Sequence, residues 1–206
     1  MKLPFSPSAL SANLATARAA TAETDAAIER YIHAAAAPRP EILFHPQIPK
    51  PLHGLAPRTI LGQVWWDELR QAAYRATGYH CAACWIPKAE ALYHPWLEAH
   101  ELYTIDYAAG TMEMVEIVAL CPSCHGYIHK GRLEMMVRDG RSTKAKHRQI
   151  LAHGERVLAE AAPDRTLRPR KIAPWPKWRL LLDGKAYPSK FADQEAWAEH
   201  YRDGGS

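Results

Sequence analysis

The sequence predicts an α+β fold in which a small metal-binding finger lies between two extensions. Three observations lead to this prediction: two close pairs of cysteines, a β-hairpin pattern between the pairs, and histidines at helical spacing after the second pair. The chain before the finger is rich in alanine and proline, and the chain after it is rich in basic residues. We therefore expect an arm at 1–60, a finger domain at 61–135 and a basic helical extension at 136–206.

Composition places the chain among ordinary globular proteins. It has 206 residues, of which 48% are hydrophobic and 23% are charged, so a disordered tail and a fibrous repeat are both excluded. This length also suffices to bury a core without disulfides. The net charge of +4 is unevenly distributed, with +2 on residues 1–80, −4 on residues 81–140 and +6 on residues 141–206.

The sequence favours a cytoplasmic protein without membrane contact. No segment approaches the roughly 20 apolar residues that a membrane span requires. The mildly apolar start is interrupted by Pro4, Pro7 and Asn13, which argues against a secretory signal peptide. Four cysteines in two tight pairs are typical of an intracellular metal site rather than a secreted disulfide framework.

The arm is expected to hold one helix and a proline-rich connection. Residues 22–36 fit a helix with a mainly alanine face, and Pro38 and Pro40 end it. Because alanine packs weakly, we interpret this helix as an accessory element that can bind a protein partner. Residues 38–58 contain six prolines and are expected to form an extended linker or wrap.

The finger domain is expected to combine a helix, a hairpin and a second, shorter helix. Apolar residues recur with helical spacing in 64–77, and Gly78 follows as a C-terminal cap. Residues 97–107 and 112–120 have strand patterns and flank a turn. The second helix follows the second cysteine pair and is expected to end at Gly131.

The basic extension is expected to contain a helix at 141–161, a strand at 178–182 and a last helix at 191–201. His147 and His153 lie on the first of these helices, where a solvated face is the expectation. Two tryptophans, Trp175 and Trp178, are expected to serve the core or an interface rather than to stack on bases.

The cysteines predict a structural zinc site. Each C-x₂-C pair can turn two thiolates toward one ion, and two such pairs supply a tetrahedral set. The alternative, a redox C-x₂-C, would require a βαβ pattern that the sequence lacks. We therefore expect one zinc ion bound by four residues: Cys81, Cys84, Cys121 and Cys124.

Three histidines predict a second site with a different character. His125 and His129 are four residues apart and share one face of a helix, while His100 lies where the hairpin begins. The cysteines already saturate the zinc, so three imidazoles around an open position indicate a catalytic metal site.

These motifs resemble those of the HNH endonuclease family. The match covers residues 64–133 and consists of Glu-Ala-His-Glu at 98–101, a hairpin, Val-Ala-Leu-Cys-Pro-Ser-Cys-His at 118–125, and His129. The resemblance implies a ββα-metal finger braced by a four-cysteine zinc. It also implies that His100, His125 and His129 bind the catalytic ion.

Two residues depart from the family pattern. Glu101 occupies the position where many members place the general-base histidine, and Glu116 stands where the family usually has a structural asparagine. A carboxylate is a weak base unless burial raises its pKa. An alternative assigns His100 as the base, with Glu101 or Glu98 helping to hold the metal.

The resemblance implies hydrolysis of nucleic-acid phosphodiester bonds. It favours DNA over RNA as the substrate, and double-stranded DNA is the expected form. A histidine site suits Zn²⁺, Ni²⁺, Co²⁺ or Mn²⁺ better than Mg²⁺, which prefers oxygen ligands. The departures also permit an inactive zinc-finger module for nucleic-acid binding or assembly. Basic residues after the finger are expected to contact phosphates: Arg141, Lys144, Lys146, Arg148, Arg168, Arg170 and Lys171.

Overall fold

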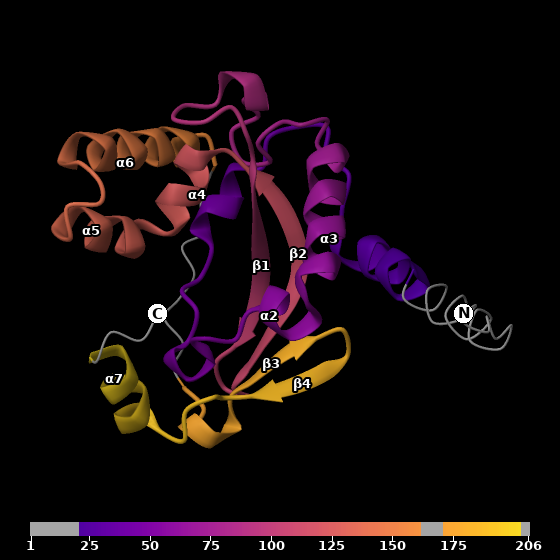
Figure 1. Ribbon diagram of the computed structural model, residues 1–206, viewed down its shortest axis with the longest axis vertical. Helices are drawn as coiled ribbons and strands as arrows, with labels where there is room; N and C mark the ends of the chain where they lie inside the picture. The colour runs from indigo at the N-terminus through magenta and orange to yellow at the C-terminus, as the bar shows by residue number, and fades with distance from the viewer. Residues whose placement is uncertain (1–20, 162–170, 203–206) are drawn as a thin grey trace, which may run out of the picture.

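The computed structural model describes residues 21–161 and 171–202, so Arg168 and Arg170 lie outside the described residues. Figure 1 shows a mixed α+β arrangement in which a small sheet stands between helices. The sheet has four strands in the order β1-β2-β3-β4. Within 21–161 and 171–202, no helix is long and apolar enough to cross a membrane.

The predicted hairpin forms the centre of the fold. β1 (Glu98–Asp106) and β2 (Thr111–Leu120) pair antiparallel, and the turn between them ends at Gly110, whose φ of 78° suits glycine. The register shifts between Leu102 and Tyr103, which is a β-bulge. The first half of β1, which carries the candidate catalytic residues, therefore keeps a regular register of its own.

The two faces of the hairpin belong to two hydrophobic clusters. On one face lies α3 (Gln63–Ala76), which confirms the helix expected at 64–77 (Figure 1). Glu101 pairs with Ile117, whose side chain packs in the cluster under α3. His100 pairs with Val118, which belongs to the cluster around the cysteines. Paired residues share a face, so His100 and Glu101 point to opposite sides of β1.

The proline-rich segment 38–58 is more regular than the expected linker. It contains two short 3₁₀ helices, η1 (Pro40–Phe44) and η2 (Lys50–Leu52). Each has a proline at its first or second position, Pro40 in η1 and Pro51 in η2, where the fixed φ favours a helical turn and the missing N–H costs no hydrogen bond. Ile42 and Leu43 of η1 are buried, so the segment is anchored to the core.

The helices after the second cysteine pair are α4 (Pro122–Ile128), α5 (Lys130–Arg138) and α6 (Lys144–Ala159). The expectation that Gly131 ends a helix is wrong, because it lies in the first turn of α5. Its Cβ position faces open space, and first-turn N–H groups need no intrahelical partner. The expected basic helix is α6, and Thr143 caps its N-terminus.

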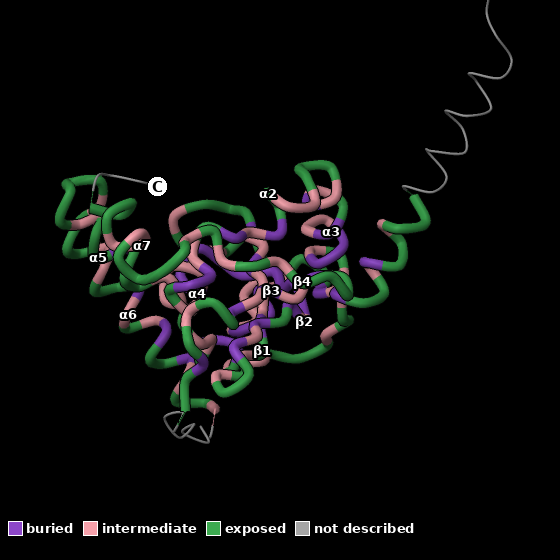
Figure 2. Tube along the Cα trace, turned by 90° about the horizontal axis from the view of Figure 1, so that it is seen from below, coloured by how far each residue is buried: buried purple, intermediate pink, exposed green. Residues whose placement is uncertain are grey.

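The C-terminal segment completes the sheet. β3 (Arg179–Leu182) pairs parallel with β2, and β4 (Lys185–Pro188) pairs antiparallel with β3. Trp178 is buried in the same cluster as the hairpin, which confirms its expected core role. The last helix is α7 (Gln194–Arg202). Figure 2 shows the buried residues gathered where strands, α3 and α4 meet, whereas α5 and α7 are mainly exposed.

The N-terminal helix also joins this core. Its described part covers residues 21–31 and ends earlier than the expected 22–36. Ala27 and Tyr31 are buried in the cluster that contains the hairpin, and the Tyr31 hydroxyl accepts a 2.8 Å hydrogen bond from the backbone N–H of Asp183. A helix that was expected to serve partners therefore packs against its own chain.

Candidate metal centres

The four cysteines meet in one compact cluster. Their Sγ atoms lie within 4.8 Å of one another, and the Sγ atoms of Cys84 and Cys121 are 3.8 Å apart. All four are free thiols, and Cys81, Cys121 and Cys124 are buried. Four convergent thiols in a buried site suit a tetrahedral structural ion such as zinc.

Local backbone geometry explains how each cysteine pair turns inward. In the first pair, the Trp85 N–H donates to the Cys81 carbonyl at 2.8 Å, and Trp85 adopts a φ of 61°. In the second pair, Cys121 caps α4: its Sγ accepts from the Cys124 N–H at 3.5 Å. Both bonds hold the two sulfurs of a pair on the same side of a turn.

His153 contacts the cysteine cluster, which corrects the expectation that it lies on a solvated face. Its Nε2 is 3.3 Å from Sγ of Cys124. The correction has a physical reason: α6 packs against α4, so this histidine faces the cluster. Sulfur ligands of zinc usually have such outer partners, which orient them and tune their charge.

The three predicted histidines also converge. Their ligand nitrogens lie within 4.8 Å of one another. Ring centroids are 5.4 Å apart for His100 and His125, 5.0 Å for His100 and His129, and 4.6 Å for His125 and His129. The helical bond from the His129 N–H to the His125 carbonyl, 3.1 Å long, sets the spacing of the last two. One hairpin strand and one short helix thus supply three imidazoles to one point.

His100 is the most enclosed member of this trio. The residue is only 3% exposed, and neither of its ring nitrogens has a hydrogen-bond partner among the described residues. Buried polar groups without partners are costly, so such a site favours binding of an ion.

The electrostatics keep two members of the trio, His100 and His129, neutral. Burial lowers the pKa of His100 to about 2, and the charges of His45, His125 and His129 act in the same direction. Burial and the charges of His125 and Arg132 lower the pKa of His129 to about 4. Neutral imidazole is the form that binds metal, so these nitrogens are ready for an ion at neutral pH.

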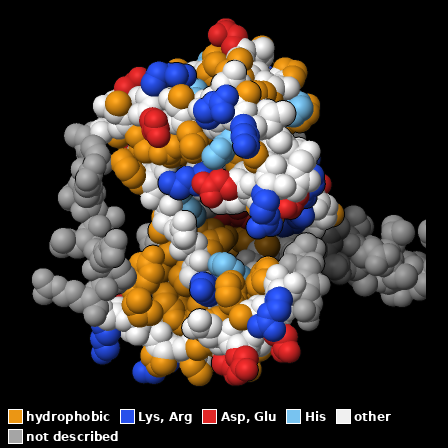
Figure 3. Space-filling model, turned by 90° about the vertical axis from the view of Figure 1, so that its left-hand side faces the viewer, with side chains coloured by type: hydrophobic (Ala, Val, Ile, Leu, Met, Phe, Trp, Pro, Cys, Tyr) orange, Lys and Arg blue, Asp and Glu red, His pale blue; other side chains and the backbone are white. Residues whose placement is uncertain are grey.

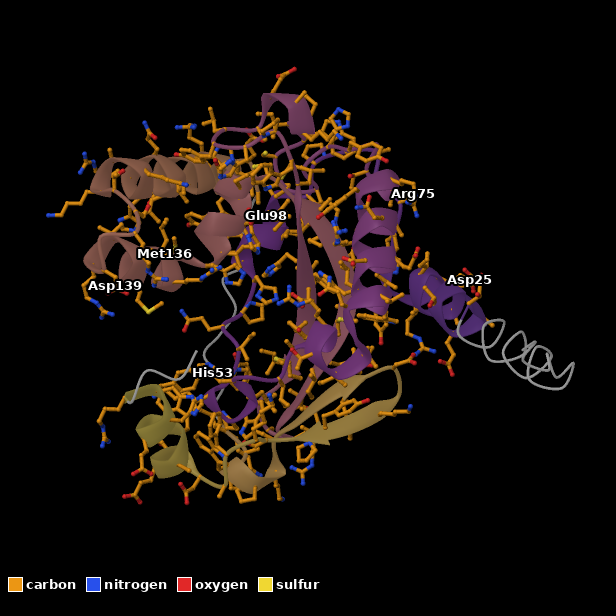
Figure 4. All side chains as sticks on the ribbon, viewed as in Figure 1. Asp25, His53, Arg75, Glu98, Met136 and Asp139 are labelled. Carbon is orange, nitrogen blue, oxygen red and sulfur yellow. The ribbon has the colours of Figure 1, made fainter. Side chains whose placement is uncertain are left out.

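Glu98 orients one of the histidines instead of joining the trio. Its carboxylate pairs with Nδ1 of His125, which leaves Nε2 for an ion. Hydrogen bonds from His125 and then from Trp96 lower the pKa of Glu98, although burial opposes them. Figure 4 shows Glu98 between β1 and α4, where it can bridge the two elements. Neither Glu98 nor Glu101 belongs to the close set of ligand atoms.

Glu101 lies across the strand from His100, as its pairing with Ile117 requires. Burial raises the pKa of its carboxyl group, and the charges of His125 and Arg58 only partly offset that effect. A raised pKa makes this carboxylate a stronger base than an exposed glutamate.

Glu116 binds the proline-rich segment. Its two carboxylate oxygens accept hydrogen bonds of 2.6 and 2.9 Å from the Arg39 guanidinium, and the residue is 6% exposed. At the position where the resemblance implies a structural asparagine, a partly buried ion pair therefore joins β2 to the chain just before η1.

A fourth histidine, which the sequence did not reveal, lies beside the trio. His45 follows η1, and its ring centroid is 4.7 Å from that of His100 and 5.8 Å from that of Tyr103. Its Nε2 is buried and has no hydrogen-bond partner within the described part of the chain. The residue stands in a proline-rich segment far from the motif, so only its side-chain type could have marked it.

A basic cavity adjoins the histidine trio. It has a volume of about 170 Å³, and His125 and His129 line it. The cations on its walls are Arg132, Arg141 and Lys146. Arg141 and Lys146 were expected to contact phosphates; Arg132 was not, because it lies inside the net-acidic middle of the sequence. Figure 3 shows basic and histidine side chains together on this face of the molecule.

The remaining described candidates do not line this cavity. Lys144, Arg148 and Lys171 are exposed. Their contribution to phosphate contact stays a prediction.

Acid sensitivity is expected from the enclosed trio. The folded-state pKa of His100 is below its unfolded value of 6.5, so the unfolded chain binds the extra proton as pH falls below that value, and stability is lost. Between pH 7 and pH 5 this group should cost about 2 kcal/mol of unfolding free energy. Urea unfolding of the zinc-loaded protein without a second ion, at pH 7 and at pH 5, measures this fall in unfolding free energy. The fall should be smaller in His100→Gln than in the wild type. Equal falls in the two proteins would contradict the assignment of the acid sensitivity to His100.

No family model, curated protein or solved structure matches this chain. Function is therefore inferred from two features of the molecule: a closed cysteine cluster and an open histidine trio beside a basic cavity.

Proposed function

We propose that this protein is a metal-dependent endonuclease of the HNH type that hydrolyses phosphodiester bonds in nucleic acid. The observation that carries the proposal is the convergence of three histidines at the edge of a cavity lined by cations. The separate cysteine cluster strengthens the proposal, because the cysteines can hold a structural ion and leave the histidines free to hold a catalytic one.

In the proposed reaction His100, His125 and His129 would hold a divalent ion. Its chemistry there would be that of a Lewis acid, which would polarise a phosphoryl oxygen and stabilise the leaving 3′ oxygen. Glu98 fixes the ring of His125, so the free nitrogen keeps its direction through the reaction.

Arg132, Arg141 and Lys146 would bind the phosphate groups of the strand and position the scissile one. A water molecule gives a proton to a base, its oxygen attacks phosphorus, and the bond from phosphorus to the 3′ oxygen breaks. Solvent returns a proton to that oxygen.

Two side chains have the chemistry to accept the water proton. Glu101 is half-buried, and desolvation raises the pKa of its carboxyl group. His45 has a ring nitrogen without a partner among the described residues, and its ring contacts that of His100. His100 itself is better suited to bind the ion, since one of its ring nitrogens lies in the close set.

A second function, a binding or assembly module without catalysis, is favoured by one observation. Glu101 and His100 lie on opposite faces of β1, so the position that resembles the family's base does not face the metal ligands directly.

A cleavage screen separates the two functions. Zinc-loaded protein is incubated with plasmid, single-stranded DNA and RNA in Mg²⁺, Mn²⁺, Ni²⁺ or Zn²⁺, while bound metal is counted. We expect cleavage with at least one ion and two bound ions per chain. His125→Ala should keep one zinc and lose at least about 100-fold in rate, whereas the exposed His200→Ala should match the wild type. Absence of wild-type cleavage in every condition would favour the binding module.

A further inference from the structure

A second cavity lies on the other side of Glu98. It has a volume of about 520 Å³, and its walls combine aromatic and basic side chains. Glu98 lines this cavity and also the basic cavity at the histidine trio, so the two share a wall. A strand bound at the trio would therefore reach the second cavity by passing Glu98.

An exposed tryptophan stands in this wall. Trp96 is 49% exposed and lines the second cavity. Its ring stacks on His94, with centroids 4.0 Å apart and an angle of 1° between the planes. His94 lines the cavity at the trio, so the stacked pair separates the two spaces.

The orientation of Trp96 is fixed before any ligand arrives. Its side chain hydrogen-bonds Glu98, which in turn pairs with the metal-site residue His125. One face of the indole is covered by His94. A large aromatic ring held in this way loses little conformational entropy when a flat group stacks on it.

Cations complete the lining. The Lys88 ammonium lies 4.8 Å from the centroid of the Tyr79 ring, and Arg70 is ion-paired with Asp67 at 2.6 Å. Lys88, Tyr79 and Arg70 all line the cavity. Aromatic faces beside basic groups are the chemistry that binds single-stranded nucleic acid, by stacking on bases and by contact with phosphates.

The backbone of this segment holds unusual conformations. Tyr79 and Tyr93 have φ values of 61° and 76°, which are unfavourable for bulky side chains. Tyr93 is held to α6, because its hydroxyl donates to Gln149 at 3.1 Å and the Lys146 ammonium lies 4.4 Å from its ring centroid. Such backbone conformations persist only where surrounding contacts fix them. We therefore take residues 79–96 to form a rigid wall of the second cavity before a ligand binds.

We propose that the second cavity binds one unpaired nucleotide of the substrate strand, with its base on Trp96 and a neighbouring phosphate at Lys88. This rests on the proposed function and names its substrate: nucleic acid that is single-stranded next to the cleaved bond. In a duplex, neighbouring base pairs cover both faces of a base, so stacking on Trp96 requires an unpaired one.

Fluorescence anisotropy with a labelled 12-nucleotide single strand and its duplex tests this inference. The zinc-loaded full chain is used without a second ion, so that no cleavage occurs. We expect the single strand to bind more tightly than the duplex. Trp96→Ala should weaken single-strand binding about 5- to 150-fold and leave duplex binding unchanged, because stacking contributes about 1–3 kcal/mol per base.

Two control variants separate stacking from indirect effects. Leu92→Ala removes another exposed apolar side chain of the same segment, 58% exposed, and should bind like the wild type. Trp96→Phe keeps an aromatic face but loses the bond to Glu98, and should retain most single-strand affinity. Loss of affinity in Trp96→Phe equal to that in Trp96→Ala would assign Trp96 to the support of Glu98 and overturn the proposal.

The outcomes also separate this inference from the proposed function. If the wild type cleaves nucleic acid but Trp96→Ala binds both forms normally, the endonuclease stands and the stacking site is wrong. If single-strand binding depends on Trp96 but no ion supports cleavage, the stacking site stands and the hydrolase is wrong. If neither form binds, both are wrong.

Discussion

Cys121→Ser is expected to leave the chain without a stable fold and without bound zinc. Cys121 is buried, and the four cysteines pack in a cluster with Val118, Leu120 and Ile42. Structural zinc contributes about 10–16 kcal/mol in small zinc domains, which matches or exceeds the roughly 5–15 kcal/mol that stabilises an ordinary domain. Metal counting and thermal unfolding followed by circular dichroism would show the loss.

Ser123→Ala provides the matched control for this change. Ser123 lies between the two cysteines of the second pair and is 2% exposed, so its substitution disturbs the same turn without removing a sulfur. It should keep one zinc and melt close to the wild type. A Cys121→Ser protein that retained the wild-type unfolding temperature would show that the cluster does not hold the fold together.

Glu101→Gln is expected to lower kcat by about 10²- to 10⁴-fold, because the amide has the shape of the carboxylate but accepts no proton. Metal binding should not change, since Glu101 is outside the close set of ligand atoms. Cleavage rates at saturating substrate, measured with the ion that supports wild-type activity, would give the ratio.

His45→Gln is the companion variant for this test. Its ring lies against His100, and its Nε2 is unpartnered among the described residues. If Glu101 is the base, His45→Gln should change kcat less than about tenfold. A large loss in His45→Gln with normal rates in Glu101→Gln would transfer the role to His45. A loss of the second ion in either variant would show that its side chain supports metal binding.

Local sequence patterns predicted which cysteines and which histidines converge. Cysteines two residues apart, and histidines four apart on a helix, converge through bonds within one turn, so spacing alone carries the information. The hairpin between the cysteine pairs then brings the two pairs together. Sequence also predicted α3 and α6, whose apolar residues recur at helical intervals.

Residues that reach the sites from distant segments could not be predicted in this way. His45 and His153 contribute through the packing of η1 and α6, and no spacing rule links them to the ligands. The proline-rich segment was misread because its buried Ile42 and Leu43, not its prolines, decide where it lies. The parallel pairing of β3 with β2 could not be predicted either, because it depends on contacts between distant segments and not on the residue pattern of either strand.

One seven-residue helix, α4, serves both the cysteine cluster and the histidine trio. Cys121 and Cys124 stand at its start, and His125 and His129 project from its middle and end. The direction of the two imidazoles is therefore set by whether the sulfurs are already held. Under the proposed function, we therefore expect the cysteine cluster to be filled before the histidine trio can bind its ion.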